Sequence, residues 1–337
     1  MINNFPLFRL PFVALYEVLD NVELETILPL SFCSKQTKLI MKNYHRSSKK
    51  VNIGFDIVQC ALKVDDCTLI SVMTTPKILE NPESVTIGPR RVPVEMEDGI
   101  LTTYWKDKRV GMAAIIKYAL DVFNVNLHSL IARGELSLAD VRFWIEWIKK
   151  FQVKIHTLSA WLETGHQEKL TKYILESDIV SGDLELLLPD FFNRWYLRPA
   201  PLPYSMDVLY LRPASWVTLD HLLAMDIKKI CLKNTHLTCK DVNVFLKPWI
   251  KGECSKKVKE VFLDILGGID FAVLFNNIEV TRRDSNSIKY FGYKGSERIV
   301  GGFDIRRKSD GAMATIMKKL GGLKILFWPD NEGNPYH

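Results

Sequence analysis

Apolar side chains recur with the period of a helix in the first 45 residues. One stripe at i, i+3, i+4 and i+7 consists of Leu15, Val18, Leu19 and Val22. Leu24 and Ile27 indicate a short middle helix, and helical spacing returns from Phe32 to Asn43. The basic run over 45–50 then predicts a linker. The chain is therefore expected to begin with three short helices.

The hydrophobic period changes to two after this linker. The alternating apolar positions are Val51, Ile53, Phe55 and Ile57. Asp65-Asp66 separates an apolar segment over 62–64 from a second over 69–73, which is typical of antiparallel strands joined by a tight turn. Helical spacing resumes at Gly111. A further helix is expected after Ser137, because Ser137 and Asp140 form an S-x-x-D capping box.

Strand and helix signals alternate in the second half of the chain. Apolar runs over 208–211 and 230–232 precede helices that begin at Thr218 and Thr238, and a third run covers 261–263. The runs recur about every 20–30 residues, which is typical of a leucine-rich-repeat-like stack. In such a stack each unit buries its apolar face against its neighbour.

Strand patterns return near the end of the chain. Segments 303–308 and 314–317 flank Asp310-Gly311, a hairpin signal, and 323–328 is another apolar run. The pattern as a whole predicts an α+β fold. It has a three-helix head, antiparallel strands and helices, an irregular leucine-rich-repeat-like strand–helix stack, and a C-terminal β segment. The expected domains are 1–46, 47–150 and 151–337.

Composition narrows this picture. Hydrophobic residues make up 47% of the 337 residues and charged residues 25%, as in soluble globular proteins. The net charge of +6 suits an acidic partner without requiring nucleic acid. Six cysteines without a C-x-x-C pair favour a reducing, intracellular compartment. The uncharged run over 10–16 is too short for a membrane span, which needs about 20 residues, and no signal-peptide cleavage site follows it.

The segment 10–39 resembles an F-box. It opens with Leu10-Pro11, continues through an amphipathic helix, and reaches Ser31-Phe32-Cys33-Ser34-Lys35 before an apolar helix. This resemblance implies docking on a Skp-type adaptor and, through it, on a cullin scaffold. The candidate adaptor-binding residues are Leu10, Pro11, Leu15, Leu19, Leu30, Cys33 and Thr37.

Physical reasoning is consistent with an adaptor but leaves an alternative open. Three short helices cannot bury all these apolar groups among themselves, and an uncovered apolar patch marks a partner surface. The alternative is that the helices pack on the rest of this chain.

A second resemblance covers the downstream region. The segments 215–223, 229–232 and 237–250, with 303–316, are similar to the F-box-associated domain of the large nematode F-box family. The resemblance implies a recognition module for a protein target beyond about residue 50. The exposed candidates for target binding are His221, Lys233, Asn234 and His236. Plain solvated positions are the alternative for each of them.

Two groups of residues in the sequence could indicate a metal site or a nucleic-acid surface, and each has a simpler explanation. The metal-like set is Cys231, His236, Cys239 and Cys254. Structural zinc sites usually have tighter cysteine pairs, so Cys231 is expected to be a small buried hydrophobe, and no metal is predicted. Basic runs at 282–283, 306–308 and 318–319, with aromatic residues at 290, 291 and 293, leave a nucleic-acid surface as an alternative.

No catalytic motif is present in the sequence. There is no H-E-x-x-H, no G-x-S-x-G, and no phosphate-binding loop at the glycine pairs. We therefore expect a non-enzymatic substrate receptor of a ubiquitin ligase, without a cofactor, whose partners are a Skp-type adaptor and an unknown protein target. A nucleic-acid-binding protein is the second hypothesis. An unrecognised enzyme, which would show a deep polar pocket, is the third.

Overall fold

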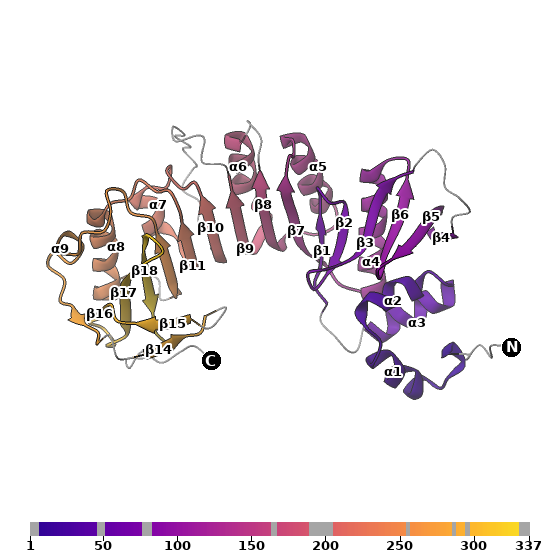
Figure 1. Cartoon of the computed structure of the whole chain (residues 1–337), viewed down its shortest axis with the longest axis horizontal. Coiled ribbons are helices and arrows are strands. Elements are labelled where there is room, and N and C mark those ends of the chain that lie inside the picture. The colour runs from indigo at the N-terminus through magenta and orange to yellow at the C-terminus, as the bar shows by residue number, and fades with distance from the viewer. Residues whose placement is uncertain are drawn as a thin grey trace. The chain divides into compact units, whose positions relative to one another are not determined.

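The computed structural model describes residues 7–45, 51–75, 83–162, 167–188, 205–253, 257–284, 288–293 and 297–329 (Figure 1). The chain forms two compact units, Met1–Arg133 and Gly134–His337. The boundaries expected after residues 46 and 150 fall inside these units, so the three-domain division stays a prediction. The linker expected at 45–50 lies almost wholly outside the described residues.

The first unit begins with the three short helices that the sequence predicts. Its helical elements are η1 (Leu7–Arg9), α1 (Phe12–Asp20), α2 (Leu24–Ser31), α3 (Lys35–His45) and α4 (Lys108–Phe123). Ser34 Oγ accepts the backbone N–H of Thr37 at 3.0 Å, which caps α3. Asp107 caps α4 by accepting the N–H groups of Arg109 and Val110. We call α1, α2 and α3 the head.

A seven-stranded part of the sheet completes the first unit. The strands are β1 (Ile53–Asp56), β2 (Ala61–Val64), β3 (Cys67–Thr74), β4 (Glu83–Ile87), β5 (Arg90–Glu97), β6 (Ile100–Trp105) and β7 (Leu127–Gly134). Their order is β7-β1-β2-β3-β6-β5-β4. Asp65 and Asp66 both have positive φ, at 47° and 70°, as the turn between β2 and β3 requires.

The expected antiparallel arrangement is correct for only part of this sheet. The pairs β1–β2, β2–β3, β4–β5 and β5–β6 are antiparallel, but β1–β7 and β3–β6 are parallel. Parallel neighbours need a crossover connection. The path from β1 to β7 includes α4, which lies between β6 and β7, whereas the path from β3 to β6 runs through β4 and β5. Gly111 lets α4 approach the sheet, because a Cβ there would lie 2.5 Å from the Trp105 ring.

The second unit is built on parallel strands. They are β8 (Ile155–Leu162), β9 (Val180–Leu187), β10 (Ser205–Arg212), β11 (Asp226–Leu232) and β12 (Glu260–Leu263), adjacent in chain order. The helices of this unit are α5 (Leu138–Lys149), α6 (Gln167–Glu176), α7 (Leu219–Ala224), α8 (Cys239–Lys251) and α9 (Phe271–Leu274). Each of α6, α7 and α8 connects two parallel strands that are neighbours in the sheet. Because such crossovers are right-handed and the strands follow one another in a single direction across the sheet, the three helices are expected on the same face.

Local sequence signals in this unit are confirmed. Capping boxes begin α5 at Ser137, α7 at Thr218 and α8 at Thr238. Along β9, Leu184 and Leu186 are buried, whereas the alternate residues are half-buried, as Asp183 is, or exposed, as Ser181 is. One face therefore packs against helices and the other stays partly open. The leucine-rich-repeat-like reading of these strand–helix units remains a prediction.

Antiparallel strands extend the sheet of the second unit at the β12 edge. They are β13 (Thr281–Arg282), β16 (Phe303–Arg306), β17 (Met313–Lys319) and β18 (Gly322–Phe327), in the order β13-β16-β17-β18-β12. The hairpin expected around Asp310-Gly311 is confirmed as the β16–β17 pair. The segment expected over 323–328 forms β18.

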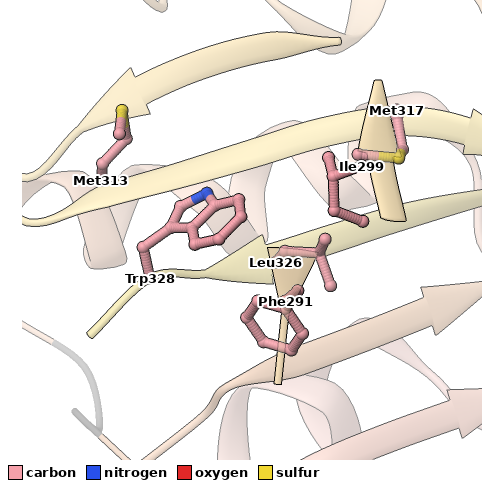
Figure 2. Packing of buried hydrophobic residues seen from close by; sticks show 6 residues of the cluster. All are labelled: Phe291, Ile299, Met313, Met317, Leu326 and Trp328. Carbon is pink, nitrogen blue, oxygen red and sulfur yellow. The ribbon is translucent and has the colours of Figure 1, made fainter. Parts of the chain in front are cut away.

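A two-stranded hairpin packs on this antiparallel part. It consists of β14 (Ile288–Phe291) and β15 (Glu297–Val300), which pair with each other. Figure 2 shows Phe291 and Ile299 from the hairpin pointing toward Leu326 and Trp328. Met313 and Met317 of β17 complete the buried cluster. The hairpin thus closes an apolar core on the strands beneath it.

Candidate functional site

The head is attached to α4 through Tyr118. The Tyr118 hydroxyl donates to the backbone oxygen of Ser31 at 3.0 Å and accepts from Ser31 Oγ at 3.1 Å. Its ring stacks on Phe32 with centroids 4.6 Å apart, and Lys38 Nζ lies 4.4 Å from the ring centroid. Burial raises the pKa of Tyr118, so its hydroxyl stays a donor at neutral pH. One side chain therefore holds the end of α2 and the start of α3.

An ion-pair cluster fastens the same surfaces. Asp121 of α4 pairs with Lys38 at 2.6 Å and also with Lys42. Hydrogen bonds from Lys38 and then Lys42 lower the pKa of the Asp121 carboxyl. The three side chains are each partly open to solvent, so the gain from each pair is modest.

Helix α1 packs on the C-terminal half of α3. The rings of Tyr16 and Tyr44 have centroids 5.4 Å apart, and the Tyr44 hydroxyl donates to Asp20. Leu15 and Leu19 are each 1% exposed on the same helix. The apolar stripe predicted from the sequence is thus largely used inside the unit.

The seven candidate adaptor-binding residues divide into three groups. Leu15, Leu19 and Thr37 are buried, the last as part of the α3 cap at Ser34. The half-buried ones are Leu10 and Leu30, and the exposed ones are Pro11 and Cys33. The three buried side chains pack within the first unit. Adaptor binding by any of the seven residues stays a prediction. The apolar stripe by which a helix is predicted is also the face that an amphipathic helix normally turns toward the core.

Sequence reasoning missed the apolar side chains that do face outward. Phe12 is 69% exposed and Val13 78% exposed at the start of α1, next to exposed Pro11. Leu39 is 58% exposed on α3. Phe12 and Val13 fall outside the Leu15–Leu19 stripe, and that is the signal by which they could have been found. We call Pro11, Phe12 and Val13 the α1 ridge.

Lys233 lies on the partly open face of the parallel strands in the second unit. Strand register puts Tyr210, Cys231 and Phe262 side by side on β10, β11 and β12. The Lys233 ammonium lies 6.0 Å from the Tyr210 ring centroid and 5.6 Å from that of Phe262. Burial raises the pKa of the Cys231 thiol to about 11, so it carries no thiolate at neutral pH. This row offers aromatic and cationic contacts rather than a nucleophile.

The other three candidate target-binding residues differ in role. His221 is the N3 residue of the α7 capping box, where its Nδ1 lies 3.0 Å from Thr218 Oγ1. Asn234 has φ of 53° at a turn, and its backbone N–H donates to Asp264. His236 is exposed. His221 and Asn234 thus shape the local fold, whereas Lys233 and His236 reach solvent; target binding by any of the four stays a prediction.

A series of ion pairs links β11, β12 and β18 to the β14–β15 hairpin. Glu260 is 5% exposed and pairs with Lys229 at 3.1 Å and with Lys324 at 3.0 Å. Lys324 also pairs with Glu297 of the hairpin, as does Lys319. A buried carboxylate needs such partners, so these charges serve the fold.

The metal-like cysteine set does not come together in the described part of the chain. Cys239 Sγ accepts the N–H of Asp270 at 3.3 Å and donates to the Gly268 carbonyl at 3.6 Å. Cys231 is 8% exposed on its strand, as expected for a small hydrophobe, and Cys254 lies outside the described residues. Among the residues that the structure describes, no group of three or more metal-ligating side chains is found.

The basic C-terminal runs are partly consumed by the fold. Arg283 is 8% exposed, bonds Asp304 and lies over the Trp328 ring at 5.2 Å. Phe291 is 1% exposed in the hairpin core. Adjacent strand residues point to opposite faces, so the run at 282–283 contributes only one exposed arginine.

Comparisons with known proteins match part of the second unit to a family and most of the chain to a relative. A family model described as F-box associated matches residues 201–259. The chain is 25% identical over 305 residues to E3 ubiquitin-protein ligase hecw-1 of Caenorhabditis elegans. That alignment covers 83% of this chain and 24% of hecw-1, so the chain spans about a quarter of that relative's length. No solved structure matches the chain.

The F-box-associated match coincides with one structural block. From residue 205 it covers β10, α7, β11 and α8, and it ends just before β12. The matched segment includes Lys233 and the neighbouring residues Tyr210 and Cys231 on β10 and β11. Within the described residues, no helix is both long enough and apolar enough to span a bilayer.

Proposed function

We propose that this chain is the substrate-recognition subunit of a Skp–cullin–F-box ubiquitin ligase. The single observation that carries the proposal is the F-box-associated match at 201–259, on the parallel strands of the second unit. The head, with the exposed α1 ridge, docks on a Skp-type adaptor in the cytoplasm or nucleus. The second unit binds a protein target, with Lys233 and His236 among its contacts.

The proposed mechanism is tethering. A receptor that binds adaptor and target at once turns ubiquitin transfer into an effectively intramolecular event, because the linked target has a high effective concentration. This chain then needs no catalytic side chain of its own. The relative hecw-1 is named as a ubiquitin-protein ligase, and a similar segment in such a protein supports a ubiquitin-ligase context.

Val13→Asp tests the adaptor contact. Val13 is 78% exposed in the first turn of α1, where a carboxylate is compatible with the helix dipole, so the fold should tolerate it. A charge buried in an apolar interface is costly. We expect Skp-type adaptor and cullin to co-purify with the wild-type chain and to be lost with Val13→Asp. Affinity purification followed by mass spectrometry measures this.

Val153→Asp is the matched control, because Val153 is 83% exposed in the second unit. It should retain the adaptor. Equal adaptor recovery from the Val13→Asp and wild-type chains would refute the docking surface. Leu15→Asp is the weaker test, since Leu15 is buried and its loss of binding could reflect a disrupted head.

A further inference from the structure

A basic pocket lies within the second unit, away from the row that contains Lys233. Its volume is about 510 Å³, within the usual range for ligand pockets. Three segments line it: the last turns of α8, the segment 277–281 and the end of β16 with the residues after it. The lining side chains therefore come from parts of the chain that are distant in sequence.

The pocket walls carry an excess of positive charge. The lining cations are Lys247, Lys251, Arg306, Arg307 and Lys308, against two lining carboxylates, Glu279 and Asp304. Asp304 already accepts from Arg283 and from Thr315 Oγ1. Arg307 makes a two-pronged pair with Asp310, both bonds at 2.8 Å. Lys251 pairs with Glu253 at 3.9 Å, outside the lining. The lining thus carries five cations and two carboxylates.

The fold holds these like charges together. Lys247 and Lys251 are four residues apart on α8, a spacing at which like charges weaken a helix. The Lys308 N–H donates to the Ile250 carbonyl at 2.7 Å, which fixes the β16 end against the α8 end. Gly252 ends α8 with φ of 81°, and a Cβ there would lie 2.6 Å from Ser309 Oγ.

We propose that this pocket binds an anionic side-chain group, phosphoryl or carboxylate, on a peptide segment of the protein target. The inference rests on the proposed function, because it names the chemistry of the target that the second unit would recognise. Clustered Arg and Lys donors form strong charge-assisted hydrogen bonds to both kinds of group. An anionic group would be attracted by the excess of cations over carboxylates in the lining.

The pocket fits a peptide group better than a nucleic acid. Single-stranded nucleic acid is held by exposed aromatic side chains on which bases stack. None of the lining residues is aromatic, and Trp249, which lies 5.2 Å beneath Arg307, is only 2% exposed. A bounded cavity also suits one or two anionic groups rather than a continuous phosphate backbone.

Fluorescence anisotropy with the purified full-length chain tests this inference. The probes are four labelled decapeptides of one backbone, carrying phosphoserine, serine, glutamates or glutamines. We expect the phosphoserine or glutamate peptide to bind and its neutral counterpart to bind at least about tenfold more weakly, as loss of charged hydrogen bonds implies. The stronger of the two anionic peptides identifies which group the pocket prefers.

Paired charge removals locate the site. Lys247→Gln with Lys251→Gln should weaken the anionic peptide about tenfold or more. The control, Lys150→Gln with Lys240→Gln, removes two exposed charges that do not line the pocket and should leave binding unchanged.

Three results would overturn the inference. They are no preference for anionic over neutral peptides, equal losses in both double variants, or displacement of the peptide by a single-stranded oligonucleotide that binds more tightly at the same residues. Adaptor co-purification by the same proteins is measured separately. Failure of the pocket and failure of the receptor assignment are therefore distinguishable.

Discussion

Tyr118 shows how one side chain decides what the head can offer to a partner. Its hydroxyl and ring engage Ser31, Phe32 and Lys38, so the head is held against α4 by side-chain contacts as well as by the chain. The surface of the α2–α3 turn that faces α4 is therefore occupied by contacts within the chain. The α1 ridge, in contrast, has exposed side chains that a partner could cover.

The Asp121 cluster gives a pH-dependent prediction for the first unit. Its pKa is lowered in the folded chain, so its contribution is complete above the unfolded value, about 3.9, and is lost as pH falls through the folded value. Asp121→Asn should lower the free energy of unfolding at pH 7 by about 0.5–1 kcal/mol. The difference from wild type should shrink as the pH falls below the unfolded value and vanish once the folded-state carboxyl is protonated.

Urea unfolding of the variants at pH 7 and in acid measures this effect. Asp98→Asn is the control, because Asp98 lies exposed in a turn of the same unit. A constant difference between Asp121→Asn and wild type at every pH would contradict the assigned ion pairs.

At the scale of elements, the β14–β15 hairpin shows how two strands are kept on a sheet. Two strands alone are marginal in water, so the hairpin depends on what lies beneath it. Phe291 and Ile299 are 1% and 0% exposed in the cluster of Figure 2, and Glu297 pairs with Lys319 and Lys324. Apolar burial and ion pairs therefore act on the same short element.

Phe291→Ala should destabilise the second unit strongly. Removing a buried phenylalanine costs about 3–5 kcal/mol, through lost transfer energy and the cavity left behind. Tyr290→Ala, at the neighbouring position, should cost far less because Tyr290 is 53% exposed. Thermal unfolding compares the two variants, and amide hydrogen exchange at 288–300 reports whether the hairpin opens first. Equal effects would show that the cluster does not hold the hairpin.

At the scale of the whole molecule, the two proposed contacts belong to different compact units. The α1 ridge is in Met1–Arg133, and the basic pocket is in Gly134–His337. A receptor that works by tethering requires both contacts in one chain but not one surface for both.

The two losses should therefore separate. Val13→Asp should lose the adaptor and keep the affinity for anionic peptide, whereas Lys247→Gln with Lys251→Gln should do the reverse. Adaptor co-purification and peptide anisotropy on the same preparations measure both. Loss of both activities in either protein would indicate a shared fold defect and contradict the assignment of separate sites.

Elements whose formation depends on near neighbours in the chain could be predicted from local sequence. Helix starts at Ser137, Thr218 and Thr238 were predictable because a capping box lies within four residues. The Asp65-Asp66 and Asp310-Gly311 turns were predictable because positive φ restricts residue type locally. β1 was likewise predictable from the alternation of its apolar residues, and α1 from the helical spacing of its apolar residues.

Which faces are covered and which distant residues meet depends on long-range packing. The sequence predicted Leu15 and Leu19 as adaptor contacts, and the structure buries both within the first unit, which the periodicity alone did not reveal. The parallel β3–β6 pair and the gathering of Lys247 with Arg306 join segments far apart in sequence. The periodicity of the sequence shows that one face of a helix or strand is apolar or charged. What covers it depends on the path of the whole chain, which no local pattern encodes.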